Sequence, residues 1–279
     1  MSLDFFVIKS LLEQVLAEDI GGGDLTTDNL FTPLIEGKAE FLAKETGIVA
    51  GLPVAQMLYQ ILDPRVKWQE AVHDGQQVYP GTVLARVEGS MRSILTGERT
   101  ALNFLQRLSA IATKTNSYVD LVSEYNVRIL DTRKTTPGLR ILEKYAVKVG
   151  GGTNHRFNLS DAVLLKDNHI KAAGSLTEAV QSIKKQIPVT AKIEVEVETL
   201  EQVREALDNK VDIIMLDNMS VSMMKKAVEL IDGRVLVEAS GGINKENILE
   251  VAATGVNLIS IGELTHTVKA LDISLEVIK

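Results

Sequence analysis

The chain has 279 residues, which is enough for one large barrel or for two packed domains. Its net charge of −7, from 30 Lys and Arg against 37 Asp and Glu, and its 4% aromatic residues argue against a nucleic-acid-binding surface. The absence of cysteine excludes disulfides, thiolate nucleophiles and cysteine-ligated zinc, and makes the cytoplasm the expected compartment.

The N-terminal segment is predicted to form an amphipathic helix over residues 5–17. It does not resemble a secretory signal, because Asp4 precedes the short apolar stretch and Lys9 and Glu13 interrupt it. No apolar run in the sequence approaches the roughly 20 residues that span a bilayer. We therefore expect no membrane partner.

The first 110 residues mix helical and strand patterns. A strand is predicted at 38–44, a helix at 53–62 and alternating strand segments from 66 to 87, with glycine turns between them. This mixture is typical of a small α/β sandwich. From residue 93 to 122 apolar residues recur at helical spacing, so a long helix is expected to carry the domain boundary.

A repeating pattern of strand and helix follows the long helix. Its apolar runs are 127–130, 162–165, 193–197, 212–216, 234–237 and 257–261. Such repeats predict a parallel β/α barrel or a close variant. Helix-start signals support the pattern: capping boxes at Ser175 and Thr199, N-caps at Ser220 and Asn244, and Pro137 at a first helical position.

Cationic side chains are concentrated between residues 128 and 171, where nine Lys and Arg stand against four Asp and Glu. In a chain that is acidic overall, this reversal predicts a site for a small anion. The candidates for a carboxylate or phosphate clamp are Arg133, Lys134, Arg156 and Lys166. His155 is a candidate for bonding substrate oxygens, whereas Lys144 is expected on a solvated helix face.

Each predicted barrel strand ends in a reactive or flexible residue. These residues are Asp131, Lys166, Glu196, Asp217, Ser240 and Gly262. Because the carboxyl ends of barrel strands meet at one mouth, we expect the residues to converge on one site. The loops 240–242 and 261–263 each precede a helix, so their backbone N–H groups are expected to hold a phosphate.

Charged side chains alternate along the strand at 192–198, so that Glu194 and Glu196 share one face. Charges facing a barrel interior need partners, and for Glu194 we expect a structural ion-pair layer with Lys192 and Lys166. For Glu196, and for Asp217 on the next strand, two interpretations stay open: a structural role, or binding of Mg²⁺ or ribose hydroxyls.

Short motifs lie at the strand ends and elsewhere along nearly the whole chain. They are DTRKTTPGLR at 131–140, EKYAV at 143–147, GGGTNHR at 150–156, KDNH at 166–169, EVEV at 194–197, LDN at 216–218, EASGG at 238–242 and GELTH at 262–266, with EDIGGGDLTT at 18–27 and GERTALN at 97–103. In these motifs the chain closely resembles the quinolinate phosphoribosyltransferase family, also called nicotinate-nucleotide pyrophosphorylase (carboxylating).

The resemblance implies an enzyme that converts quinolinate and phosphoribosyl pyrophosphate to nicotinate mononucleotide, pyrophosphate and CO2, with Mg²⁺, in NAD biosynthesis. The implied fold is α/β: an open, incomplete β/α barrel at 111–265, and an N-terminal α/β sandwich domain at 1–110 that is joined by residues 266–279. The family's members are homodimers, and the resemblance implies that Arg99 completes the site of the neighbouring subunit. Assembly beyond the dimer stays open.

The resemblance also implies roles for individual residues. Quinolinate would be bound by Arg99, Thr132, Arg133, Lys134, His155, Arg156 and Lys166. Phosphoribosyl pyrophosphate and its phosphates would be bound by Lys134, Lys166, Glu196, Asp217, Ser240, Gly241, Gly242, Ile261, Gly262 and Glu263. The implied catalytic residues are Lys134, Lys166, Glu196 and Asp217, and the last two would hold Mg²⁺ directly or indirectly. Glu263 departs from the small residue expected at its position.

Two other classes of protein stay open from the residues alone. A barrel aldolase would use Lys166 as a Schiff-base amine, which borohydride would trap with a carbonyl substrate. A non-catalytic phosphosugar-binding protein would bind ligand without turnover.

Overall fold

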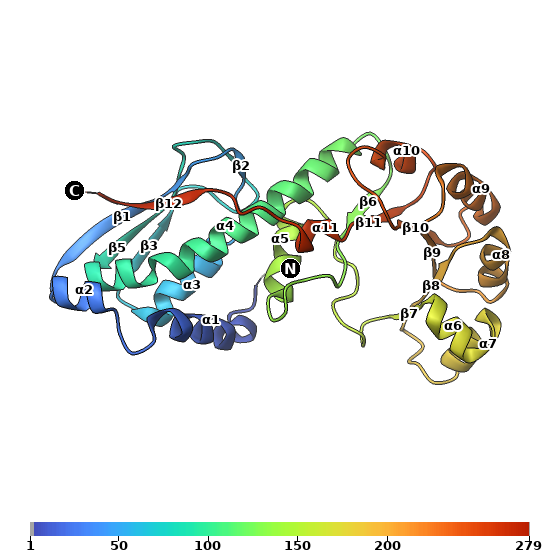
Figure 1. Ribbon diagram of the computed structural model, residues 1–279, viewed down its shortest axis with the longest axis horizontal. Coiled ribbons are helices and arrows are strands. Elements are labelled where there is room, and N and C mark those ends of the chain that lie inside the picture. The colour runs from blue at the N-terminus through green and yellow to red at the C-terminus, as the bar shows by residue number, and fades with distance from the viewer. Residues whose placement is uncertain (1–2, 279) are drawn as a thin grey trace. The chain divides into compact units, whose positions relative to one another are not determined.

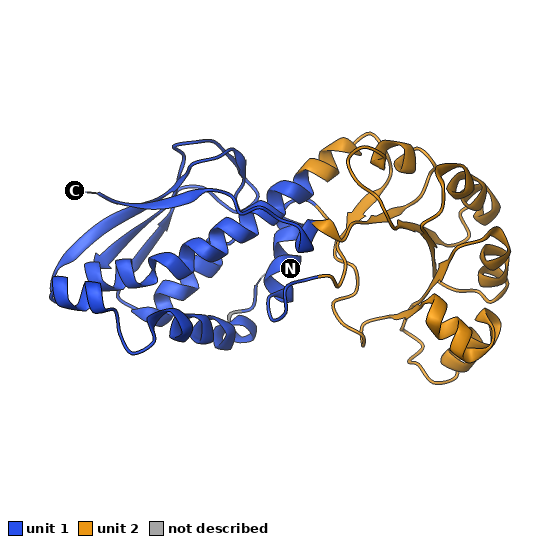
Figure 2. Ribbon diagram, in the orientation of Figure 1, with its two compact units in different colours: residues 1–116, 135–151, 264–279 blue, residues 117–134, 152–263 orange. Residues whose placement is uncertain are grey.

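The computed structural model describes residues 3–278, which fall into two compact units (Figure 2). Unit 1 comprises residues 1–116, 135–151 and 264–279, and unit 2 comprises residues 117–134 and 152–263. The long helix α4 (Met91–Leu121) runs through the boundary. Residues 135–151, which lie inside the expected barrel range 111–265, cluster with unit 1 and contain α5 (Arg140–Val149).

Unit 1 is built on an antiparallel sheet in the order β12-β1-β5-β3. The strands are β1 (Glu36–Ala43), β3 (Lys67–Glu70), β5 (Val83–Ser90) and β12 (Ile273–Ile278), so the end of the chain pairs with its first strand. β2 (Gly47–Ile48) and β4 (Gln77–Val78) form a separate pair. The helices are α1 (Phe5–Ile20), α2 (Leu25–Leu30), α3 (Leu52–Leu62), α5, α11 (Glu263–His266), which begins at the boundary, and the first part of α4.

Apolar side chains of the sheet and helices form the core of unit 1. Phe41 of β1 is fully buried and its ring lies 6.3 Å from Tyr59 of α3 and 5.4 Å from Trp68 of β3. The buried Tyr59 hydroxyl donates to the carbonyl of Ile94, so its one polar group is satisfied. Among the described residues no helix is long and apolar enough to cross a membrane.

Unit 2 contains a six-stranded parallel sheet in the order β6-β11-β10-β9-β8-β7 (Figure 1). The strands are β6 (Arg128–Leu130), β7 (Val163–Leu165), β8 (Ile193–Val197), β9 (Ile213–Asp217), β10 (Leu236–Ser240) and β11 (Leu258–Ser260). All six predicted strands are thus confirmed. β6 and β7 are the edge strands of this order, so the sheet is curved and open, as expected for an incomplete β/α barrel.

Helices cover the outer face of the curved sheet (Figure 1). They are α6 (Asp167–Ala173), α7 (Leu176–Lys184), α8 (Leu200–Asp208), α9 (Val221–Ile231) and α10 (Ile248–Ala252). Three predicted caps are confirmed, since Ser175, Thr199 and Ser220 each accept a backbone N–H of the first turn. Thr199 and Ser220 fix where α8 and α9 begin after β8 and β9, and therefore the length of those loops at the mouth, whereas Ser175 begins α7 directly after α6.

Three predictions about helices are wrong. Asn244 does not begin a helix, because its side chain accepts from Glu246 N in a turn and α10 begins only after Asn247. Pro137 lies in the loop before α5, whose first residue is Arg140. Lys144 is only 2% exposed and therefore does not lie on a solvated face.

Candidate active site

The register of the parallel sheet aligns the polar strand ends of unit 2. Asp217, the last residue of β9, lies opposite Ser240, the last residue of β10. On the other side of β9, Val197 at the end of β8 lies opposite Leu216. Carboxylate and hydroxyl groups therefore lie together at the carboxyl ends of the strands, where β/α barrels carry their sites.

A lysine and a glutamate form an ion pair at the carboxyl ends of two neighbouring strands. Lys166 follows β7, and its Nζ donates to Oε2 of Glu196 on β8 at 3.0 Å. The Glu196 side chain is 13% exposed and the Lys166 side chain 48%, so the pair is open to solvent on the lysine side. A displaceable lysine beside a fixed carboxylate suits a site that exchanges charged ligands.

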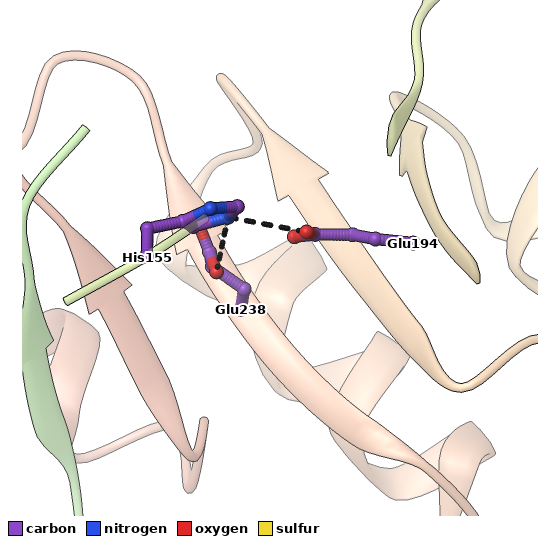
Figure 3. A group of neighbouring side chains, drawn as sticks. All are labelled: His155, Glu194 and Glu238. Atoms are coloured by element: carbon purple, nitrogen blue, oxygen red, sulfur yellow. Dashed lines mark ion pairs between the residues drawn. The ribbon is translucent and has the colours of Figure 1, made fainter. Parts of the chain in front are cut away.

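His155, Glu194 and Glu238 form a buried polar cluster (Figure 3). The two glutamates lie within β8 and β10, two or three residues before the carboxyl ends of these strands. Nε2 of His155 lies 3.1 Å from Oε2 of Glu194 and 3.5 Å from Oε2 of Glu238. Both glutamates are buried, with 3% and 0% of their surface exposed. The predicted partners of Glu194 are wrong: Lys192 is exposed and Lys166 pairs with Glu196.

The hydrogen bonds of His155 define its tautomer. The backbone N–H of Arg156 donates to Nδ1 at 2.7 Å, so Nδ1 is an acceptor and Nε2 carries the proton toward the glutamates. The three residues offer ligand atoms within 4.8 Å of one another, a spacing that a metal ion could bridge. Because Nε2 has no lone pair in this tautomer, the arrangement favours a hydrogen-bonded network over a metal centre.

Glu238 is held in an environment that opposes its ionisation. Burial, and after it the neighbouring charge of Glu194, raise the pKa of Glu238 to about 8, although His155 and Ser260 lower it. Glu238 is not among the predicted site residues, although it belongs to the EASGG motif. Glu238 lies two residues before Ser240, so both side chains lie on the same face of β10. This spacing could have predicted that Glu238 lies on the face that carries the site.

The loop after β6 and the segment around His155 are fixed by one aspartate. Asp131 is fully buried and accepts from Nδ2 of Asn154 at 2.6 Å and from the backbone N–H of His155 at 2.8 Å. It therefore positions the segment that carries Arg156, instead of offering a free carboxylate at the mouth as its place at a strand end suggested.

Arg156 is half-buried next to another cation. Its Nη1 donates to the carbonyl of Ala162 at 2.9 Å, which fixes part of the guanidinium. Burial lowers the pKa of Arg156, the charge of Arg133 lowers it too, and the charges of Glu194 and Asp161 oppose them. Two guanidinium groups close enough to repel each other form an electrostatic site for an anion. Arg133 itself is exposed.

The other residues named from the sequence occupy different settings. Thr132 accepts through Oγ1 from the backbone N–H of Lys134 at 3.1 Å, which shapes the loop after β6. Glu263 accepts a hydrogen bond from the Tyr118 hydroxyl, which explains why a large residue is accommodated there. Arg99 is exposed on α4 within unit 1.

The glycine of the β10 loop is required by its surroundings. Gly241 has φ +90°, and a Cβ there would lie 2.2 Å from Oδ1 of Asn218. Gly242 also has positive φ, +63°, but open space around it. By contrast, Gly150 of the GGG motif lies at the end of α5, packed against α4. A Cβ on Gly150 would lie 2.4 Å from the carbonyl oxygen of Ala112, so close packing alone explains the glycine.

The resemblance implies that this loop binds a phosphate of phosphoribosyl pyrophosphate, so replacing Gly241 by alanine is expected to raise KM for phosphoribosyl pyrophosphate about tenfold and to leave KM for quinolinate unchanged. A left-handed conformation costs a residue with a side chain about 1–2 kcal/mol, and the clash with Asn218 displaces the loop backbone. Steady-state kinetics with each substrate varied in turn measures both values. Gly233→Ala is the matched control, since Gly233 has φ +68° in open space; equal effects of the two variants would contradict the assignment of the loop.

Fold and site together define a β/α-barrel protein with a cationic site for a small anion, bordered by acidic strand ends. Family models identify it further. Residues 24–109 match the N-terminal domain of quinolinate phosphoribosyl transferase, and residues 111–276 match the C-terminal domain. The chain belongs to the quinolinate phosphoribosyltransferase family.

Individual relatives agree with this assignment along the whole chain. The probable nicotinate-nucleotide pyrophosphorylase (carboxylating) of Synechocystis sp. is 46% identical over 99% of this chain and 94% of its own length. The corresponding protein of Bacillus subtilis is 45% identical over 97% of this chain and 93% of its own. The crystal structure of NadC from Streptococcus pyogenes has a TM-score of 0.96 at 43% identity, covering all of both chains.

Proposed function

We infer that the chain transfers the phosphoribosyl group of phosphoribosyl pyrophosphate to quinolinate, with loss of CO2, to give nicotinate mononucleotide and pyrophosphate in NAD biosynthesis. The observation that carries this conclusion is membership of the family over both domains, at 46% identity to a curated relative. The cytoplasm, the compartment expected from the cysteine-free sequence, is the proposed place of the reaction.

The cationic side of the site is proposed to bind quinolinate. Two adjacent carboxylates on the pyridine ring match the paired guanidinium groups of Arg133 and Arg156, and Thr132, Lys134 and His155 complete the proposed pocket. The electrostatic effect of Arg133 on Arg156 supports this role, because a dianion would relieve their repulsion. Binding both carboxylates orients the ring nitrogen toward C1 of the ribose.

The acidic strand ends are proposed to face the ribose. Loss of pyrophosphate builds cationic character at C1, which the carboxylate of Glu196 would stabilise. Lys166, at 3.0 Å from Glu196, is proposed to lie between the two substrates and, with Lys134, to take up charge from the leaving group. No protein nucleophile is needed, since the ring nitrogen attacks C1 directly.

The phosphate of the ribose is proposed to bind the backbone N–H groups of the loops 240–242 and 261–263. Positive φ at Gly241 and Gly242 turns consecutive backbone groups into a concave arrangement, which supports anion binding there. The loops follow β10 and β11, the late strands whose loops hold phosphates in many barrels.

Mg²⁺ is the proposed cofactor, and the residues present fit it. Glu196 and Asp217 supply two carboxylates from neighbouring strands, and Mg²⁺ binds well through one or two carboxylates with phosphate and water completing its shell. When bound, it would neutralise charge on the pyrophosphate.

Decarboxylation requires no organic cofactor in this proposal. Once the nitrogen is alkylated, CO2 departs and the positive ring nitrogen stabilises the electron pair left at C2, which then takes a proton from water. The protein has to hold the second carboxylate and exclude alternative orientations. Arg133 and Arg156 are proposed to do so.

We propose that the working form is a homodimer in which Arg99 of one subunit reaches the quinolinate pocket of the other. Its exposure on α4 supports this role, because the guanidinium is available to a partner. Whether dimers assemble further is a question for light scattering on the purified protein.

The test of the proposed function is formation of nicotinate mononucleotide and CO2 from the two substrates, with and without Mg²⁺. EDTA is expected to abolish turnover and added Mg²⁺ to restore it.

Glu196→Gln is expected to lower kcat about a hundredfold, because it removes the charge facing C1. Glu198→Gln, an exposed neighbour, is the control. Turnover that is indifferent to EDTA would contradict the metal's role, and borohydride trapping of Lys166 would point to the aldolase alternative.

A further inference from the structure

The polar atoms around Glu238 outnumber the donors beside them. Among the residues that the structure describes, both carboxylate oxygens of Glu238, Oε1 of Glu194 and Oγ of Ser260 are buried without a hydrogen-bond partner. The Ser260 hydroxyl faces Glu238 and can donate to one of its oxygens, which leaves one oxygen on each glutamate without a donor. A buried acceptor without a donor costs about 1–3 kcal/mol, and more if it is charged. One hydrogen placed between the two carboxyl groups would satisfy an oxygen on each side.

The surroundings of Glu238 also disfavour a second negative charge. Met215 of β9 and Leu258 of β11 flank it in the sheet. The polar groups that face it are Glu194 of β8, the Nε2–H of His155 and the Ser260 hydroxyl of β11. His155 lowers the pKa of Glu238 by less than burial and Glu194 raise it, so one imidazole does not compensate two buried carboxylates.

We propose that Glu238 is a positioning residue that stays protonated in the working enzyme, and that its O–H donates a hydrogen bond to the Glu194 carboxylate. This bond orients Glu194 to accept from Nε2–H of His155, and Nδ1 of His155 in turn holds the backbone N–H of Arg156. A neutral Glu238 adds no negative charge to the network that holds the Arg156 segment. The inference rests on the proposed function, which assigns Arg133 and Arg156 to quinolinate.

The same geometry accounts for a dependence on pH. Loss of the proton breaks the bond to Glu194 and adds a negative charge beside His155 and Glu194, the groups next to Arg156, which weakens dianion binding. With a pKa of about 8 for Glu238, kcat/KM for quinolinate is expected to fall about tenfold from pH 7 to pH 9. KM for phosphoribosyl pyrophosphate should change little over this range, because its proposed contacts lie at the strand ends.

The experiment compares the wild type, Glu238→Gln and Glu201→Gln by steady-state kinetics from pH 6.5 to 9. Glutamine is neutral and can donate a hydrogen bond, so E238Q should match the wild type within about twofold at pH 7 and lose the alkaline decline for quinolinate. E201Q removes an exposed glutamate and should keep the decline. A decline in E238Q equal to that of the wild type would overturn the proposal.

A second measurement needs no variant and no turnover. In wild-type protein labelled with ¹³C at the glutamate carboxyl carbon, one glutamate should be protonated at pH 7 and titrate near pH 8, and ¹⁵N shifts should show His155 with its proton on Nε2. If all glutamates are ionised at pH 7, the proposal fails. If the protonated glutamate is found but Arg156→Ala leaves KM for quinolinate unchanged, the network stands and the assignment of the quinolinate pocket fails.

Discussion

Replacing Arg156 by alanine is expected to lower kcat/KM for quinolinate by about a hundredfold or more. Removing one partner of a desolvated charge pair costs about 2–5 kcal/mol, and 1.4 kcal/mol corresponds to a factor of ten. Arg156 is half-buried and already fixed by the carbonyl of Ala162, so its guanidinium is ordered before the substrate arrives. Steady-state kinetics with quinolinate varied measures the loss.

Two comparisons separate the loss of the anion contact from structural damage. Arg156→Lys keeps the charge but loses the planar fork, and it should recover only part of the activity. Arg204→Ala removes an arginine that is 58% exposed on α8 and should leave kcat/KM unchanged. A variant Arg156→Ala with normal quinolinate kinetics and normal thermal stability would contradict the placement of the dianion.

Replacing Arg107 by alanine is expected to destabilise the protein by about 3–5 kcal/mol. Arg107 of α4 donates through Nε to Oε1 of Glu143 at 2.9 Å and through Nη2 to Oγ1 of Thr136 at 2.6 Å. Glu143 is fully buried, and its Oε2 accepts from the Thr136 backbone N–H at 3.1 Å. Without Arg107 a buried carboxylate loses its counter-charge, which is costly. Urea denaturation followed by circular dichroism measures the shift.

The double variant Arg107→Met, Glu143→Leu tests the cause of that destabilisation. Because it removes both charges, it should recover most of the stability lost in the single variant. Arg86→Ala breaks a more exposed pair with Glu40 in the same unit and should cost only about 0–1 kcal/mol. If the Arg107 and Arg86 variants were equally stable, the buried pair would not be a determinant of stability.

The barrel strands were predictable because each is a short apolar run between polar helical stretches, and a buried parallel strand produces that signal directly. Ser175 and Thr199 marked helix starts correctly because a cap is a local interaction within four residues. The predictions at Pro137 and Asn244 were wrong because proline and asparagine are common in loops as well as at helix starts.

The buried cluster could not be derived from the sequence, because it depends on contacts between distant segments. Glu194 and Glu238 lie on strands separated in the sheet by β9, and His155 comes from a loop before β7. The alternation along β8 predicted that Glu194 needs an interior partner but not which one. Lys144 was misplaced similarly, since a spacing of four residues does not reveal which face of α5 is buried.

The central claim is that cations from separate loops of unit 2 meet around the pyridine dicarboxylate. A crystal structure of the protein with quinolinate bound tests it most directly. We expect the two carboxylates within hydrogen-bonding distance of the guanidinium groups of Arg133 and Arg156, with the ring nitrogen facing Glu196. Quinolinate bound away from both arginines, or the two arginines turned to opposite sides of the molecule, would contradict the account.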